Sequence, residues 1–210
     1  MRITLIGMSG SGKTHWSKEL EARGFRRFCC DDMIEEKLRA ELVQDGLKGG
    51  INDVSEWMGQ PYEKRYAQRS RRYLYLEAEM MREIFQHIEN ELPSDVDVVI
   101  DTTGSVIYTS ENIIDKLSTL TMIVYLDSPA SVQEKMYSLY LKDPKPVIWG
   151  DLFQKKKGES SAKALARCYP KLLEFRTNRH QELADVTLDY YRVRQPDFTV
   201  EELLNIVSRP

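Results

Sequence analysis

The chain has 210 residues and a formal net charge of −3, from 30 Lys and Arg against 33 Asp and Glu. This length suits a single domain over residues 1–210 that buries a core without metal or disulfides. The slightly acidic balance argues against the broad basic face of a nucleic-acid-binding protein, and no apolar run approaches the roughly 20 residues of a membrane span.

The cysteines and the first residues bear on the compartment. Cys29, Cys30 and Cys168 form an odd set with no C-x-x-C spacing, which suits free thiols in a reducing environment. Met1 leads into an apolar segment with no secretory signal peptide. We therefore expect a cytoplasmic protein that is a monomer or weak homo-oligomer, binds a small-molecule acceptor and does not associate with a membrane.

The first element is an apolar strand over residues 2–6, followed by the motif G-x-x-x-x-G-K-T. Its glycines let backbone N–H groups turn toward phosphate oxygens, Lys13 can reach the β- and γ-phosphates, and Thr14 can place its hydroxyl on Mg²⁺. The motif predicts a P-loop that binds ATP with Mg²⁺. The residues that we expect at the nucleotide are Gly7, Ser9, Gly10, Ser11, Gly12, Lys13, Thr14 and His15, the last without a catalytic role.

Two carboxylates follow the second expected strand. A helix over residues 14–23 ends at Gly24, and residues 26–30 form a short strand. Asp31 and Asp32 come next and are expected to cap a helix whose apolar residues recur at helical spacing. Asp31 can cap and bind a ligand at once, whereas Asp32 is the simpler cap neighbour.

The middle of the chain is expected to form the substrate side, over residues 46–92. Three glycines break the pattern at 46–52, and a long helix rich in Arg and Tyr is expected over residues 61–92. The apolar run 96–100 predicts a buried strand that delivers Asp101, Thr102, Thr103 and Gly104 at its end.

The last third continues the alternation of strands and helices. We expect a strand over 121–127, a helix that Ser128 and Pro129 begin, and a charged, Pro-spaced lid over 143–158. A helix over 160–183, a strand over 186–188 and a terminal helix with a capping box complete the pattern. This order predicts an α/β fold of the P-loop NTPase type, three layers with a five-stranded parallel sheet and a mobile lid. The segments that follow the strands, Asp127 included, should then converge at one edge of the sheet.

The order of these segments resembles the shikimate kinase family of the nucleoside-monophosphate-kinase-like P-loop kinases, over about residues 1–190. Residues 31–35 are similar to that family's D-x-x-I-E segment, which implies that Asp31 holds substrate hydroxyls. Residues 102–106 stand at its G-G-G-S-V substrate loop, so Thr102, Thr103 and Gly104 would contact the substrate.

Two further segments carry the resemblance. Lys145 precedes Pro146 where the family has the R-P of its lid, which implies a contact of Lys145 with the nucleotide, although a solvated surface lysine remains an alternative. Arg176, followed eight residues later by A-D-V-T, matches the family's R-x(3)-Y-x(3)-A-D segment with His180 at the Tyr position. Arg176 would then bind a substrate anion.

The chain also departs from the family. Cys29 stands where the family has an Asp that binds magnesium-linked water, and Asp101, at the end of a strand, is expected to hold the Mg²⁺ shell instead. The family's substrate-carboxylate Arg aligns near Leu74, which leaves Arg69, Arg71 or Arg72 as displaced substitutes. Because a bidentate arginine is the natural partner of a carboxylate, its loss suggests a substrate other than shikimate.

The resulting hypothesis is an ATP-dependent small-molecule kinase that transfers the γ-phosphoryl group to an acceptor hydroxyl, with Lys13, Asp31 and Asp101 as its catalytic residues and Thr14 and Asp101 at the metal. Alternatives are a nucleotide-binding regulatory module without transfer, and a polynucleotide 5′-kinase that uses the Arg-rich helix. A GTPase is disfavoured because no N-K-x-D run occurs.

Overall fold

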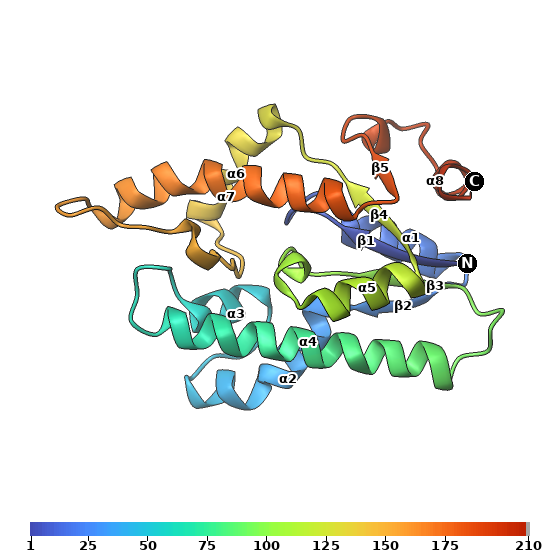
Figure 1. Ribbon diagram of the computed structural model, residues 1–210, viewed down its shortest axis with the longest axis horizontal. Helices are drawn as coiled ribbons and strands as arrows, with labels where there is room; N and C mark the ends of the chain where they lie inside the picture. Colours follow the sequence, from blue (N-terminus) through green and yellow to red (C-terminus); the bar gives the residue numbers. More distant parts are fainter. Residues whose placement is uncertain (209–210) are drawn as a thin grey trace.

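Five parallel strands form the central layer of the protein in the order β2-β3-β1-β4-β5 (Figure 1). The structure is a computed structural model that describes residues 1–208. The predicted five-stranded parallel sheet is confirmed, with strand ends within two residues of those expected. The strands are β1 (Arg2–Ile6), β2 (Arg26–Cys29), β3 (Val98–Asp101), β4 (Met122–Leu126) and β5 (Val186–Leu188).

Successive residues of the three inner strands, β1, β3 and β4, point into two different cores. In β1, Ile3 and Leu5 pack with Trp16 and Leu20 of one core, whereas Ile6 belongs to the other. Strands buried on both faces need continuous apolar runs, and helices must cover both faces. The result is the predicted three-layer α/β/α arrangement.

The helices divide between these two faces. Helices α1 and α8 contribute to the smaller core, and α2, α4, α5 and α7 contribute to the larger one. The long helices α4 and α7 run along opposite sides of the molecule in Figure 1, and α4 belongs to the segment expected on the substrate side. The helices are α1 (Lys13–Ala22), α2 (Cys30–Gln44), α3 (Ile51–Met58), α4 (Tyr66–Asn90), α5 (Glu111–Leu120), α6 (Ala130–Lys142), α7 (Ser161–Leu183) and α8 (Val200–Val207). Within residues 1–208, none of them combines the length and the apolar character that crossing a membrane requires.

Several predicted helix ends are wrong. Asp31 and Asp32 do not cap α2 but lie in its first turn, because the chain passes from β2 into the helix at Cys29, whose extended backbone makes it the N-cap. Pro129, with no side-chain cap, takes that place before α6 instead of Ser128.

The expected helix over 61–92 is also corrected. It begins only at Tyr66, because Glu63 accepts a hydrogen bond from the backbone N–H of Gln60 and closes a turn there. A separate helix, α3, precedes it and was not predicted.

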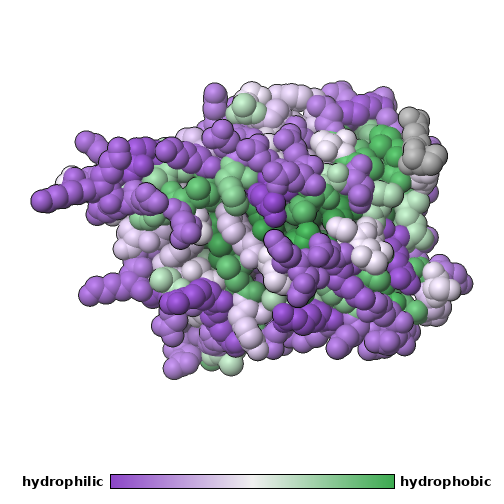
Figure 2. Space-filling model, viewed as in Figure 1, coloured by the Kyte–Doolittle hydropathy of each residue, from purple (hydrophilic) through white to green (hydrophobic). Residues whose placement is uncertain are grey.

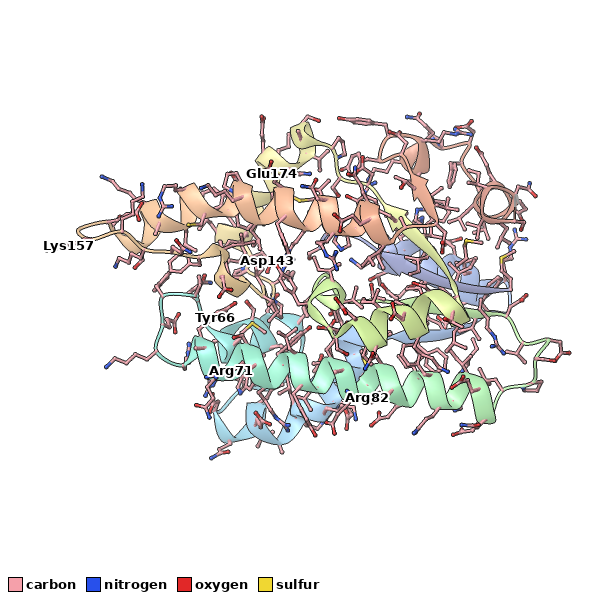
Figure 3. The ribbon with its side chains drawn as sticks, viewed as in Figure 1. Tyr66, Arg71, Arg82, Asp143, Lys157 and Glu174 are labelled. Atoms are coloured by element: carbon pink, nitrogen blue, oxygen red, sulfur yellow. The ribbon has the colours of Figure 1, made fainter. Side chains whose placement is uncertain are left out.

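The segment 143–158 is not exposed throughout. Ile148 and Trp149 are buried in the larger core, and the hydroxyl of Tyr66 donates to the carbonyl oxygen of Val147 at 3.0 Å and accepts from the N–H of Trp149 at 2.8 Å. The exposed part extends beyond this anchor, with Lys157 at the far tip (Figure 3). The mobility of the lid stays a prediction.

Candidate active site

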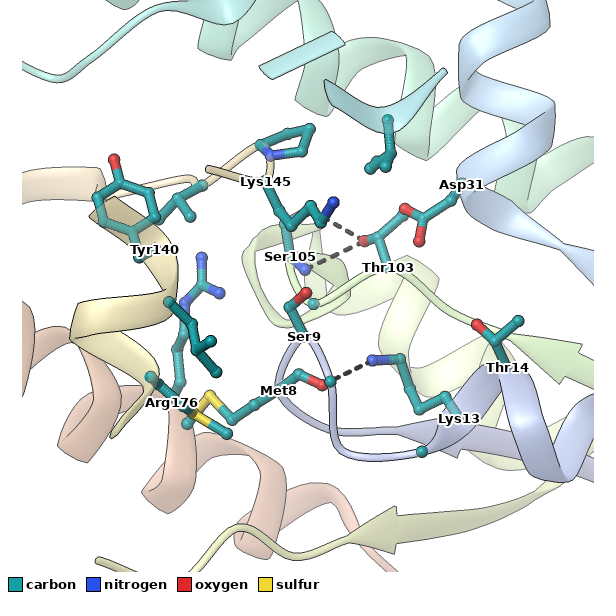
Figure 4. Close-up of a pocket in the computed structure, with 18 of the residues that line it drawn as sticks. Met8, Ser9, Lys13, Thr14, Asp31, Thr103, Ser105, Tyr140, Lys145 and Arg176 are labelled. Carbon is teal, nitrogen blue, oxygen red and sulfur yellow. Dashed lines mark hydrogen bonds between the residues drawn. The ribbon is translucent and has the colours of Figure 1, made fainter. Parts of the chain in front are cut away.

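A cavity of about 600 Å³ opens at the carboxyl ends of the strands and brings together most of the predicted site residues (Figure 4). They come from segments far apart in the chain, as expected for an open parallel sheet. Those that line the cavity are Ser9, Gly10, Gly12, Lys13, Thr14, His15, Asp31, Thr103, Gly104, Lys145 and Arg176. Those that do not line it are Gly7, Ser11, Asp101, Thr102 and Asp127.

The P-loop backbone has the shape that phosphate binding requires. Gly7 has a φ of 146°, and a Cβ there would lie 2.8 Å from both the carbonyl oxygen of Leu126 and the hydroxyl of Ser11, so only glycine fits. The N–H groups of Gly12 and Lys13, at the start of α1, find no acceptor among residues 1–208. These donors sit where a helix N-terminus favours an anion.

Lys13 is buried beside this loop. Its Nζ donates to the carbonyl oxygens of Gly7 at 2.9 Å and of Met8 at 3.0 Å. Burial lowers its pKa, while Asp31 and Asp101 act in the opposite direction. The ammonium group is therefore held at the mouth of the loop between carbonyl oxygens that an incoming phosphate oxygen can replace.

Asp101 lies behind the P-loop in a cluster that the sequence did not predict. It accepts hydrogen bonds from the hydroxyl of Ser17 at 2.9 Å and from Nη2 of Arg27 at 3.2 Å, and Nε of Arg27 donates to Ser17 at 2.8 Å. Arg27 lines the cavity and is an ion-pair partner of Asp101. One carboxylate oxygen of Asp101 is therefore engaged within the protein, and its role at the metal stays a prediction.

Asp31 is a carboxylate that lines the cavity and has a raised pKa. It lines the cavity from the first turn of α2 and accepts no hydrogen bond from any residue in 1–208. Burial raises its pKa to about 6, and the nearby Lys13 only partly opposes this. An unpaired carboxylate with a raised pKa in a cleft is a candidate for binding or proton transfer.

The turn after β3 divides its residues between the core and the cavity. Thr102 donates its hydroxyl to the carbonyl oxygen of Leu5 at 2.7 Å and is 1% exposed, so its side chain is used within the fold. Thr103 and Ser105 face the cavity and bind Glu77 of α4 through their hydroxyls.

Glu77 is the main polar residue that sequence reasoning missed. It is 1% exposed, and burial raises its pKa to about 7, against the hydrogen bonds from Thr103 and Ser105, which lower it. Its four-residue spacing from Tyr73, on the same helix face, is a sequence signal for a shared orientation, but nothing local identified that face as the one toward the cavity.

Arg176 reaches the cavity from α7. Its Nη2 donates to the carbonyl oxygen of Ile148 at 2.9 Å, and Nη1 lies 3.5 Å from the position of a Cβ on Gly104. Its Nε is buried with no hydrogen-bond partner among residues 1–208. The guanidinium group therefore retains donors for a ligand.

His180 and Lys145, which the resemblance also singled out, are engaged with other residues of the protein. His180 is fully buried and stacks on Tyr125 with ring centroids 5.3 Å apart, and burial lowers its pKa to about 3, so it is neutral at physiological pH. Lys145 donates to Oδ1 of Asn52 at 2.6 Å and pairs with Asp143 at 2.8 Å. Lys145 thus ties the lid segment to α3.

The arginines proposed as displaced substitutes lie elsewhere. Arg69 pairs with Asp45 at 2.6 Å and Arg72 with Glu41 at 2.8 Å, while Arg71 is exposed on α4 (Figure 3). None of the three lines the cavity. Arg71 and Arg72 lie on other faces of α4 than Tyr73 and Glu77. Arg69 is four residues before Tyr73, but Asp45 and the carbonyl oxygen of Trp57 hold its guanidinium group outside the cavity, so the cavity lining gives a substitute arginine from this helix no support.

The sheet order, the P-loop and the converging cavity define the fold of a P-loop kinase. Comparison with solved structures agrees: the chain is similar to shikimate kinase from Acinetobacter baumannii in complex with shikimate, at 19% identity and a TM-score of 0.54 over 97% of this chain and 87% of that one. It is also similar to shikimate kinase from Aquifex aeolicus, at 17% identity and a TM-score of 0.55 over 99% of this chain and 96% of that one. Its similarity to shikimate kinase from Bacteroides thetaiotaomicron is at 16% identity and a TM-score of 0.59 over 100% of this chain and 99% of that one. The chain therefore has a shikimate kinase-like fold. No protein-family profile and no curated protein matches the sequence.

Proposed function

We propose that the protein is an ATP-dependent kinase that transfers the γ-phosphoryl group of ATP to a hydroxyl group of a small-molecule acceptor. The observation that carries this proposal is the presence of Lys13, Asp31 and Arg176 in one cavity. A phosphate-binding lysine, an unpaired carboxylate and an anion-binding arginine are the groups that such a transfer needs.

The P-loop supports nucleotide binding through its free N–H groups. The Mg²⁺ that accompanies ATP prefers oxygen ligands and keeps several waters, which suits the Thr14 hydroxyl together with phosphate oxygens, with Asp101 acting through water. When bound, the ion neutralises charge on the phosphates.

Asp31 supplies the acceptor side of the reaction. Above its pKa of about 6 it is ionised and can accept a hydrogen bond from the acceptor hydroxyl. In the transfer, the hydroxyl oxygen forms a bond to the γ-phosphorus, the bond to the ADP oxygen breaks, and the hydroxyl proton passes to Asp31. Positioning and charge neutralisation supply most of the rate acceleration.

The segment 143–158 would act as the lid. Lys145 projects from it into the cavity (Figure 4), where it would neutralise charge on the transferred group, and closure would exclude water that otherwise hydrolyses ATP. The free thiols of Cys29, Cys30 and Cys168 suit a cytoplasmic enzyme of this kind.

The test is acceptor-dependent ADP release by the purified protein with MgATP, measured beside Lys13→Ala. We expect the Lys13→Ala rate to fall about 100-fold or more with an unchanged melting temperature of the fold. The matched control is Lys116→Ala, which removes an exposed α5 lysine paired with Glu89 and should keep full activity.

Two results would contradict the proposal. Undiminished turnover by Lys13→Ala would remove the P-loop from the reaction. Tight, Lys13-dependent ATP binding with no acceptor response would instead favour the regulatory module.

A further inference from the structure

We infer the chemical class of the acceptor, an inference that rests on the proposed kinase function. The acceptor is a hydroxyl compound with a single anionic group and an apolar body, either aromatic or branched aliphatic. The inference concerns the half of the cavity away from the P-loop. It rests on which hydrogen-bonding groups there are free, which side chains form the wall, and where the cations lie.

Three hydroxyl groups around the acceptor half, those of Thr103, Ser105 and Tyr140, are already engaged within the protein. Thr103 and Ser105 bind Glu77, and Tyr140 donates to the side-chain oxygen of Gln60. A ligand with many hydroxyls needs many free partners, because each buried polar group left unpaired costs free energy. These three side chains do not offer them, whereas Asp31 keeps an unpaired carboxylate for one acceptor hydroxyl.

The wall beside these groups is apolar. Side chains from α6, α7, α3 and the lid segment face the cavity next to Arg176, and the ring of Tyr140 is among those drawn in Figure 4. Hydrophobic residues are also visible between two hydrophilic rims on the face in Figure 2. The apolar lining residues are Ile51, Met136, Leu139, Tyr140, Val147, Tyr169, Leu172 and Leu173.

The cations in the cavity leave one anion site for the acceptor. Lys13 and Lys18 lie on α1, which begins at the P-loop, and Arg27 is paired with Asp101. Lys145 is paired with Asp143 and donates a hydrogen bond to Asn52. Arg176 has a buried Nε without a partner among residues 1–208, and it stands beside the apolar wall. One carboxylate or phosphate on the acceptor satisfies this guanidinium group.

A polyhydroxylated acid such as shikimate fits this arrangement poorly. Its additional hydroxyls would be desolvated against the apolar wall without partners, whereas an aromatic or branched aliphatic body would gain from burial there. This difference in burial and hydrogen bonding should give the apolar acceptors a kcat/KM about tenfold or more above that of the polyhydroxylated acids.

The test compares two sets of monocarboxylates at equal concentration with the full chain. The apolar set is 3-phenyllactate and 2-hydroxyisocaproate, and the polar set is shikimate and gluconate. Two quantities are measured: binding by calorimetry in the presence of a non-hydrolysable ATP analogue, and ADP release with MgATP. We expect the apolar set to bind about tenfold or more tightly than the polar set.

Two variants make the test specific. Arg176→Gln should weaken binding of 3-phenyllactate but not of its neutral analogue 3-phenyl-1,2-propanediol. Leu139→Asp changes a side chain that is 61% exposed, so it should leave the fold intact and weaken binding of the apolar set alone. The matched control is Leu141→Asp, which changes another exposed leucine of α6 that does not line the cavity.

The two proposals fail in different ways. Preference for the polar set, or no binding of either set, overturns the inferred acceptor class even when ADP release with some other acceptor supports the kinase. Binding of the apolar set with no ADP release from any acceptor supports the class of ligand and overturns the transfer.

Discussion

The hydroxyl of Ser105 donates a 2.8 Å hydrogen bond to the carboxyl group of Glu77, which also accepts from the hydroxyl of Thr103. The two donors lie in the turn after β3, and the acceptor lies on α4. This contact fixes the turn that carries Gly104 against Arg176, so a residue outside the cavity determines the shape of its wall.

We predict that Glu77→Ala destabilises the protein by about 2–4 kcal/mol, because it removes the carboxylate that accepts from two buried hydroxyls, which keep only the bond between themselves, and leaves a void in the core. The acceptor KM should rise several-fold while the ATP KM changes little. Glu77→Gln, which keeps a hydrogen-bonding oxygen, should recover most of both losses. Chemical denaturation and steady-state kinetics measure these effects.

The control for this prediction is Glu79→Ala, on the same helix but bound only to the exposed Tyr75. An equal loss of stability in Glu79→Ala, or an acceptor KM unchanged in Glu77→Ala, would contradict the positioning role of Glu77.

Glu77 also shows what the sequence could not reveal. The strands and the P-loop were predictable because their signals are local: apolar runs, glycine spacing and a following amphipathic helix. The partners of Glu77 are 26 and 28 residues away, and only the packing of α4 under the turn brings them together. The same holds for Arg27, which β2 places beside Asp101.

Local sequence signals also failed to predict helix α3 and the burial of Trp149. The eight-residue helix α3 follows Gly49 and Gly50, which indicate a loop rather than a helix, and its amphipathic pattern is too short to outweigh them. Trp149 lies in a segment rich in Pro and Lys, which favours exposure, yet its backbone is held by Tyr66 far away in the chain. Tertiary contacts outweighed composition in both places.

Asp31 should make activity and stability respond to pH in opposite directions. Its pKa is about 6 in the fold against an ordinary value of 3.8, so the folded state disfavours the charged form. Activity, which needs the carboxylate, should fall as pH drops through 6. The free energy of unfolding should instead fall as pH rises from 3.8 to 6 and remain reduced above that.

The variant Asp31→Asn separates these two effects. It should lose about 100-fold or more of the transfer rate, yet be more stable than the parent at pH 7, by ~1–3 kcal/mol, with the gain absent below pH 3.8. Thermal denaturation across pH measures the stability. A variant less stable than the parent at pH 7 would show that Asp31 is mainly structural.

The Arg27–Asp101 pair is expected to be strongly coupled. Asp101 is 3% exposed, and Arg27→Ala would leave its carboxylate buried without a cation, at a cost of about 3–5 kcal/mol. Removing both groups in Arg27→Ala/Asp101→Ala should cost less than the sum of the single changes. A double-mutant cycle measured by denaturant unfolding gives this coupling, and additive losses would mean that the pair does not interact.

Gly7 and Gly10 provide a matched comparison within the P-loop. Both have positive φ, but a Cβ on Gly7 would lie 2.8 Å from two oxygens, whereas a Cβ on Gly10 meets nothing within 4 Å. Gly10→Ala should therefore cost about 1 kcal/mol of backbone strain, and Gly7→Ala should cost more and abolish ATP binding because the loop must move. Equal effects on the two variants would show that the clash is relieved elsewhere.

Tyr66 anchors the lid segment to α4, since one hydroxyl serves both the carbonyl oxygen of Val147 and the N–H of Trp149. Tyr66→Phe should cost about 1–3 kcal/mol, because it leaves that buried N–H and carbonyl group unpaired. The anchored stretch also gives the carbonyl oxygen of Ile148 to Arg176, so the variant should bind the acceptor anion less tightly. ATP hydrolysis without acceptor should rise relative to transfer, because a loosened lid admits water.

Hydrogen exchange over residues 143–158 distinguishes this role from simple core packing. Tyr66→Phe should speed exchange in this segment more than in α5, whereas the control Tyr62→Phe, at an exposed ring, should change neither. If exchange rises equally throughout the protein, Tyr66 stabilises the whole fold and does not hold the lid. In that case the bond from Arg176 to Ile148 would be the remaining anchor, and Arg176→Gln would be expected to speed exchange in this segment alone.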